Sequence, residues 1–156
     1  MSLEIERIGT QLRLALEGGA WHGPSVLESL EDVSAEAARA HPIAGAHSIW
    51  ELVLHLCATY RLVLRRLGGD GRPLTPEEDW PSVASQTPAD WQNAIRALRD
   101  LNEELRLAVR GFNPERLDEP LVPEPPYTAY VQFIGITQHD LYHAGQIVLL
   151  KRALTR

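Results

Sequence analysis

The chain has 156 residues, 44% of them hydrophobic and 23% charged, which excludes disordered and fibrous classes and predicts a single domain over 1–156. The net charge of −6, from 21 acidic and 15 basic residues, disfavours nucleic acid and anionic membranes as partners because both are negatively charged. The lone Cys57 cannot form an internal disulfide, and Glu4 and Glu6 stand where a signal peptide is apolar, so we expect a cytoplasmic protein.

Hydrophobic residues at helical spacing begin near the start of the chain. They predict a first long helix over 5–17, which the Gly18-Gly19 pair ends. Pro and Ser residues then open a short helical stretch over 26–33, and a further turn runs out near Pro42. We interpret these short elements as a crossover between long helices.

A second long helix is predicted over 48–67, because Ser48 and Glu51 stand at the spacing of a capping box before a run of apolar positions. The following stretch, 70–88, contains four prolines and shows no sustained period. We expect it to be a long loop, and loops of that length are often functional.

The third long helix begins at Thr87-Pro88, which supply a cap and a first-turn proline, and runs to about Arg110. Prolines keep 111–127 irregular, and Thr128 caps a last helix that reaches about Leu154. The sequence therefore predicts an all-α protein, a four-helix bundle with long crossover connections.

Histidines on two of these helices form a candidate metal site. His139 and His143 are four residues apart and differ by only about 40° around the helix, on its inward face. His55 lies at the edge of the buried stripe of the second long helix and can face them. Three neutral imidazoles suit zinc, nickel, iron or copper and leave a position open, although a hydrogen-bonded core pair is the alternative for His139 and His143.

Three neighbours could support these ligands. Gln146 shares the inward face with His143, Glu51 lies one turn before His55, and His47 precedes the helix cap. The capping box is the simpler explanation of Glu51, and a place in the preceding loop is the simpler explanation of His47.

The chain offers no protein nucleophile of its own. Cys57 lies about 160° around the helix from His55 and is interpreted as a packing residue. Asp140 stands where the HExxH helix of metalloproteases requires glutamate, and no Ser-His-Asp arrangement is visible. We interpret the four tryptophans as packing anchors: Trp21, Trp50, Trp80 and Trp91.

Two segments resemble the DinB-like family of DNA-damage-inducible helical proteins. They are the stretch from Ser48 to His55 and the run His139-Asp-Leu-Tyr-His143-Ala-Gly-Gln. The stretch Trp21-His-Gly-Pro-Ser is similar to members too, whereas 70–80 finds no match. Ala144 occupies a position where many members carry arginine.

The resemblance implies a four-helix bundle in which His55, His139 and His143 hold a divalent metal, zinc or nickel first and iron as a further option. It implies a homodimer and a thiol-dependent transferase that acts on small electrophiles, with a low-molecular-weight thiol as one substrate. A hydrolase ranks second among the enzymes. The alternative from another class is a stress-response protein that binds metal or ligand without turnover.

Overall fold

The structure is a computed structural model that describes residues 2–155. Four long helices are joined by short helical elements, and this part of the chain contains no strand. The elements in chain order are α1 (Leu3–Glu17), α2 (Val26–Ser29), α3 (Ala35–Arg39), α4 (Ile49–Leu67), α5 (Pro76–Asp79), α6 (Pro88–Arg110), the 3-10 helix η1 (Pro114–Arg116) and α7 (Ala129–Leu154). The all-α fold is confirmed.

Three of the long helices, α4, α6 and α7, begin at a residue whose side chain caps the first turn. In α4 the Ser48 hydroxyl accepts from the Glu51 backbone N–H at 3.2 Å, and the Glu51 carboxylate accepts from the Ser48 backbone N–H at 2.7 Å. Thr87 caps α6 and Thr128 caps α7 in the same way through their side-chain oxygens. These caps satisfy backbone donors that would otherwise have no partner in the first turn.

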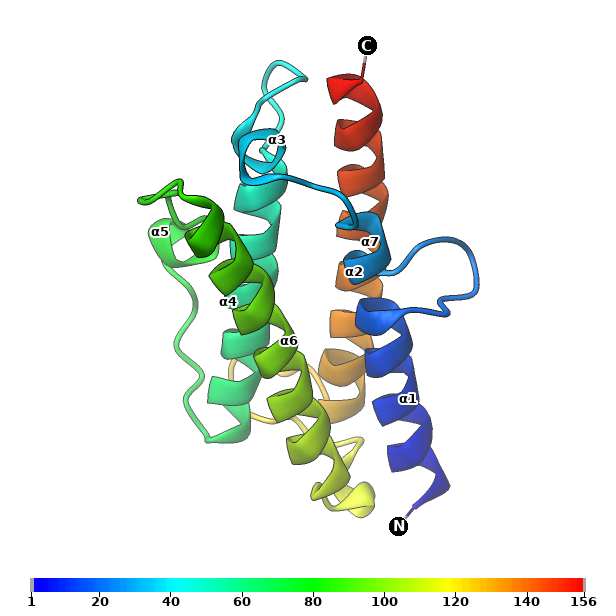
Figure 1. Ribbon diagram of the computed structural model, residues 1–156. Helices are drawn as coiled ribbons and strands as arrows, with labels where there is room; N and C mark the ends of the chain where they lie inside the picture. The colour runs from blue at the N-terminus through cyan, green and yellow to red at the C-terminus, as the bar shows by residue number, and fades with distance from the viewer. Residues whose placement is uncertain (1, 156) are drawn as a thin grey trace.

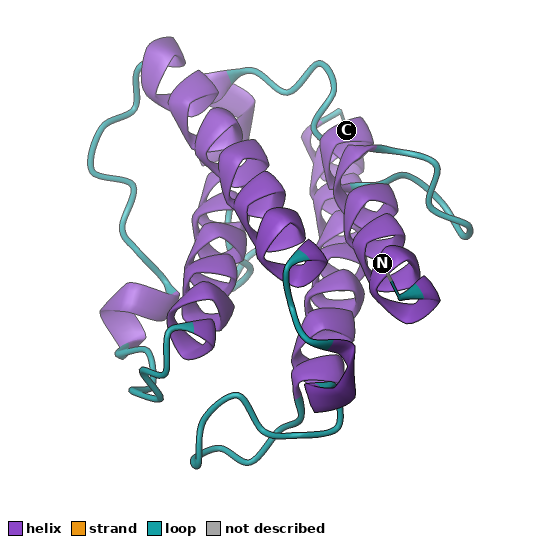
Figure 2. Cartoon of the chain, turned by 90° about the horizontal axis from the view of Figure 1, so that it is seen from below, coloured by secondary structure: helices purple, strands orange, loops and turns teal. Residues whose placement is uncertain are grey.

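The four long helices form a ring in which each packs against two others. Both α1 and α4 pack against α6 and α7. In Figure 1, α1 and α7 run upward while α4 and α6 run downward, so α4 and α7 are antiparallel neighbours. Figure 2 shows the same four helices from below, with the loops outside the ring. The parallel pair α4 and α6 requires the long connection 68–87 to return along the bundle.

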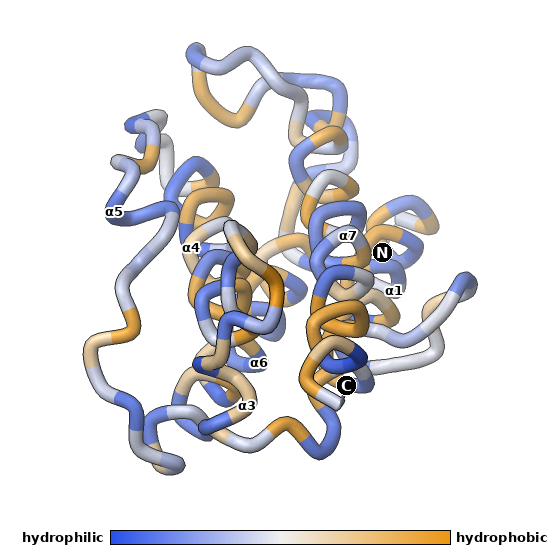
Figure 3. Tube along the Cα trace, turned by 90° about the horizontal axis from the view of Figure 1, so that it is seen from above, coloured by the Kyte–Doolittle hydropathy of each residue, from blue (hydrophilic) through white to orange (hydrophobic). Residues whose placement is uncertain are grey.

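Side chains between the helices form one apolar core. Figure 3 shows hydrophobic and hydrophilic residues interspersed along the long helices, and the buried hydrophobic residues form one cluster between them. Trp50 and Trp91 meet where α4 and α6 begin, with ring centroids 5.2 Å apart, and the Trp91 indole donates to the Val33 carbonyl at 2.8 Å. These two tryptophans are packing anchors, as predicted.

A buried polar network crosses the core beside these apolar contacts. The Tyr60 hydroxyl donates to the Asp140 carboxylate at 2.6 Å and accepts from the Asn102 amide at 2.8 Å. The same amide donates to the Leu12 carbonyl at 3.1 Å. The network therefore ties α1, α4, α6 and α7 together.

Two expectations about loops were wrong. The stretch 70–88 is not wholly a loop, because a capping box of Thr75 and Glu78 starts the short helix α5 within it. Trp21 is not a packing anchor, since 89% of it is exposed in the loop after α1. That loop leaves the bundle at Gly18 and Gly19, whose φ angles of 148° and 82° turn the chain outward.

Candidate metal site

The antiparallel contact between α4 and α7 brings the three candidate histidines together. The Nε2 atom of His139 lies 3.0 Å from Nε2 of His55 and 3.0 Å from Nε2 of His143. Ring nitrogens of all three lie within 4.8 Å of one another. His55 and His143 are buried and His139 is half-buried, so the cluster sits at the edge of the core.

Contacts on the far side of two rings fix which nitrogen carries the proton. His55 Nδ1 lies 2.8 Å from the Asp79 carbonyl oxygen and 3.1 Å from its carboxylate. His143 Nδ1 lies 2.6 Å from the side-chain oxygen of Gln146. Because these oxygens only accept, both rings hold their proton on Nδ1 and present a lone pair at Nε2.

The proton of His139 cannot satisfy both neighbours. A neutral His139 carries one ring proton, so its Nε2 can donate to one of the two facing lone pairs at most. Its other nitrogen, Nδ1, is buried without a hydrogen-bond partner. At least one contact between nitrogen lone pairs therefore remains, and a cation between the three nitrogens would relieve it.

Burial keeps the rings of His139 and His143 neutral. It lowers the pKa of His139 to about 3, with smaller contributions from the neighbouring His143 and His55. Burial also lowers the pKa of His143, while its hydrogen bond to Gln146 opposes the shift. Neutral imidazole is the form that binds metal, so these two rings are ready to ligate at neutral pH.

The donor set fits a divalent metal. Tetrahedral zinc with Zn–N bonds of about 2.0–2.1 Å separates its ligand nitrogens by roughly 3.3 Å, close to the 3.0 Å separations here. Three nitrogen ligands suit zinc, nickel or iron and leave a coordination position for water or substrate. Structural zinc sites, by contrast, are closed by four protein ligands.

An aromatic stack covers the outer face of His55. Trp80 lies parallel to the His55 ring at 3.9 Å between centroids, with an angle of 2° between the planes. His47 stacks on the other face of Trp80 at 3.6 Å and 6°. The three rings form one column, and His55 is its innermost member.

The predicted supporting residues occupy different places. Gln146 contacts His143 directly, whereas His47 reaches His55 only through Trp80. The Glu51 carboxylate is engaged by the Ser48 cap and by His41 Nε2 at 3.0 Å.

Asp79 and Trp80 were missed by the sequence analysis, which placed no site residue in the 70–88 stretch. The spacing of Thr75 and Glu78, identical to that of Ser48 and Glu51, signals a helix there. That helix ends at Asp79 and brings Trp80 against His55.

A cavity of about 260 Å³ lies next to the cluster. Gln146 and His47 form its polar side, and most of the remaining wall is aliphatic. Its lining residues are Ile43, Ala46, His47, Leu52, Gln146, Leu149 and Leu150. The space suits part of a small molecule.

Two nearby groups are unsuited to nucleophilic or base chemistry at the cluster. Cys57 is buried, and burial raises the pKa of its thiol to about 11. Asp140 is fully buried, its carboxylate accepts from Tyr60 in the core, and burial raises its pKa to about 7. The chain therefore supplies no thiolate here, and Asp140 does not serve as the base of a metalloprotease.

Comparison with known proteins identifies the family. No curated protein and no solved structure matched the chain. Within residues 2–155 no helix is both long enough and apolar enough to cross a membrane. A family model described as the DinB superfamily matches residues 21–147, which include all three clustered histidines. The chain belongs to the DinB superfamily.

Proposed function

We propose that this protein is a metal-dependent enzyme whose divalent ion is held by His55, His139 and His143. Membership of the DinB superfamily and the three-histidine cluster fit a metal-binding protein. The observation that carries the proposal is the convergence of three Nε2 atoms, two of which present lone pairs fixed by Asp79 and Gln146. Zinc and nickel are the first candidates, and iron is a further one.

The reaction we propose is transfer of a thiol to a small electrophile. A divalent metal held by His55, His139 and His143 would supply the Lewis acidity that lowers the pKa of a thiol substrate. The thiolate sulfur then forms a bond to the electrophilic carbon, and the leaving group departs with the electron pair of the broken bond. The thiol proton passes to the leaving group or to solvent. An external thiol is needed because Cys57 is buried and protonated.

The first experiment tests metal binding. We expect about one zinc or nickel ion per chain by elemental analysis, or by titration of protein stripped with a chelator. His143→Ala should abolish binding, because it removes one of three ligands. His22→Ala is the matched control, since His22 is exposed outside the cluster. A wild-type protein that takes up neither metal contradicts the proposal.

A non-catalytic metal- or ligand-binding role is the rival function. It is favoured by the burial of His55 and His143, which are 8% and 4% exposed and leave mainly His139 open to substrate. Thiol addition to the cobalt-substituted protein separates the two functions. A transferase should show a changed visible spectrum and faster consumption of an electrophile, and His139→Ala should lose both. An unchanged spectrum and rate favour the binding protein.

We also propose that the protein is a homodimer. Several large apolar side chains on α7 are exposed, including Tyr142 at 65% and Leu149 at 59%. A self-complementary interface would bury such a face. Light scattering at micromolar concentration tests the assembly, and a monomer would remove this part of the proposal without affecting the metal site.

A further inference from the structure

A segment outside the four long helices holds the outer side of His55. We define the arm as residues 70–80, which contain α5. The carbonyl and carboxylate oxygens of Asp79 accept from the Nδ1–H of His55 at 2.8 and 3.1 Å. Trp80 lies flat against the same ring at 3.9 Å. Two consecutive residues of the arm therefore restrain the imidazole in two directions.

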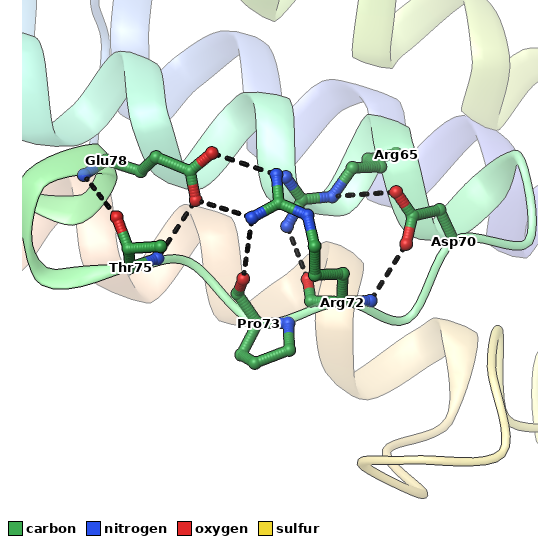
Figure 4. A network of polar contacts seen from close by, with 6 residues as sticks. All are labelled: Arg65, Asp70, Arg72, Pro73, Thr75 and Glu78. Carbon is green, nitrogen blue, oxygen red and sulfur yellow. Dashed lines mark hydrogen bonds and ion pairs between the residues drawn. The ribbon is translucent and has the colours of Figure 1, made fainter.

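The arm is fastened to itself and to α4 by charged side chains. Arg72 makes a bidentate ion pair with Glu78 at 2.8 and 2.9 Å, and Glu78 also completes the capping box with Thr75 (Figure 4). Arg65 of α4 donates to the Arg72 carbonyl and lies 3.5 Å from the Asp70 carboxylate (Figure 4). These contacts fix where α5 ends and so where Asp79 stands.

The two buried ligands differ in how they are oriented. His143 is held by Gln146, three residues further along the same helix. His55 has no such partner on α4, and the acceptor for its Nδ1 comes from a residue 24 positions away. Helix α4 fixes the Cα of His55, but the ring can still rotate about two side-chain bonds.

We propose that the arm positions His55 for metal binding, with Asp79 selecting the ring tautomer and Trp80 fixing the ring plane. The inference rests on the proposed metal site and adds a positioning role for residues that touch no metal. Hydrogen-bond partners on the far side of a ligating histidine fix its orientation and raise its affinity for metal. The arm is the only source of such contacts to His55 Nδ1 among the described residues.

Zinc affinity measured by competition with a chromogenic chelator tests the proposal. Trp80→Ala should weaken binding by about 10–100-fold. Asp79→Ala should weaken it less, because it removes the carboxylate and keeps the carbonyl that accepts from His55 Nδ1. Trp80→Phe keeps an aromatic face and should stay close to wild type, whereas Trp80→Leu should resemble Trp80→Ala. Trp21→Ala is the matched control, because that tryptophan is 89% exposed and contacts none of the three histidines. Wild-type affinity in both Asp79→Ala and Trp80→Leu would overturn the proposal.

A second readout separates positioning from a general loss of structure. In metal-free protein, ¹⁵N NMR of the His55 ring should show the proton on Nδ1. Replacing residues 72–79 with glycine and serine, together with Trp80→Ala, removes α5 and with it the Asp79 carbonyl contact, so the two tautomers should mix, while His143 keeps its Nδ1 proton through Gln146. An unchanged His55 tautomer in this arm variant overturns the proposal. If the wild type binds no metal, the proposed function fails, yet this measurement still decides what the arm does.

The ion pair within the arm allows a test with a residue that does not contact His55. Glu78 touches no histidine, so Glu78→Gln changes the site only by breaking the bidentate pair with Arg72. We expect a several-fold loss of zinc affinity, smaller than for Trp80→Ala. The control Glu17→Gln removes a surface ion pair to Arg106 on the α1 side of the bundle and should leave affinity unchanged. Equal affinities for Glu78→Gln and Glu17→Gln would show that the anchor does not support the site.

Discussion

Two buried polar clusters use neighbouring residues of α7 and behave in opposite ways. His139 faces the histidine cluster, and the next residue, Asp140, faces the network with Tyr60 and Asn102. In the network each hydrogen bond joins a donor to an acceptor, and only Asn102 Oδ1 and Asp140 Oδ1 lack a partner. In the histidine cluster acceptors face one another. The comparison shows that buried polar groups stabilise the core where donors meet acceptors and can form a metal-binding site where lone pairs meet.

The largest expected difference is the response to metal. Zinc at about a thousand times its dissociation constant should raise the free energy of unfolding by about 4.1 kcal/mol, because the ion binds only the folded cluster. Denaturant unfolding with and without zinc measures this gain. His143→Ala should show no gain, whereas Tyr60→Phe should keep it in full. A loss of the zinc response in Tyr60→Phe would mean that the two clusters are not separate.

The pH dependence of stability should have opposite signs in the two clusters. Burial raises the pKa of Asp140 to about 7, so the native state holds its proton when the unfolded state, with a carboxyl pKa of about 3.9, has released it. This contribution to stability declines as pH rises from about 4 to 7. Burial lowers the pKa of His139 to about 3, so its contribution rises with pH up to the unfolded value of about 6.5.

Asp140→Asn isolates the carboxyl contribution. In metal-free protein the difference in unfolding free energy between wild type and Asp140→Asn should shift in favour of the variant as pH increases from 4.5 to 7.5. Glu31→Gln, on the exposed surface, should follow the wild-type curve. A constant difference for Asp140→Asn across this range would rule out a buried carboxyl with a raised pKa.

Removal of one hydroxyl should damage the network. Tyr60→Phe leaves Asp140 and the Asn102 amide without their shared partner, and we expect a loss of about 1–3 kcal/mol in unfolding free energy. Tyr142→Phe removes a hydroxyl from a side chain that is 65% exposed and should cost almost nothing. Similar losses in the two variants would show that the buried Tyr60 hydroxyl contributes no more to the unfolding free energy than an exposed hydroxyl does.

The smallest effect is expected from the histidine cluster without metal. His139→Leu removes the unpartnered Nδ1 and the contact between lone pairs. We expect the unfolding free energy of the metal-free variant to lie within about 1 kcal/mol of wild type, although the variant should bind no zinc. A loss as large as that of Tyr60→Phe would make the histidines a structural element like the network.

The helix-borne half of the site could be predicted from sequence. His139 and His143 share a face because of their four-residue spacing, and the Ser48 capping box sets where α4 begins and so where His55 points. Such features depend on residues within one or two turns. The convergence of all three on one point also needed the antiparallel packing of α4 and α7, which the family resemblance supplied.

The arm could not be predicted to the same extent. The capping box of Thr75 and Glu78 is a local signal for α5, but nothing local places Trp80 between His55 and His47. That position depends on the return of the connection along α4 and on contacts from Arg65. The exposure of Trp21 likewise follows from where its loop leaves the bundle. The neighbouring sequence contains no pattern that predicts it.

The wide sequence separation of the ligands has a consequence for folding kinetics. His55 and His139 lie 84 residues apart, so the three nitrogens meet only after α4 and α7 have docked. Contacts between residues so far apart in the sequence form late in folding. Isolated helices would capture an ion weakly through His139 and His143 alone. Tight metal uptake should therefore follow the rate of tertiary assembly and lag behind the appearance of helical circular dichroism in a refolding experiment.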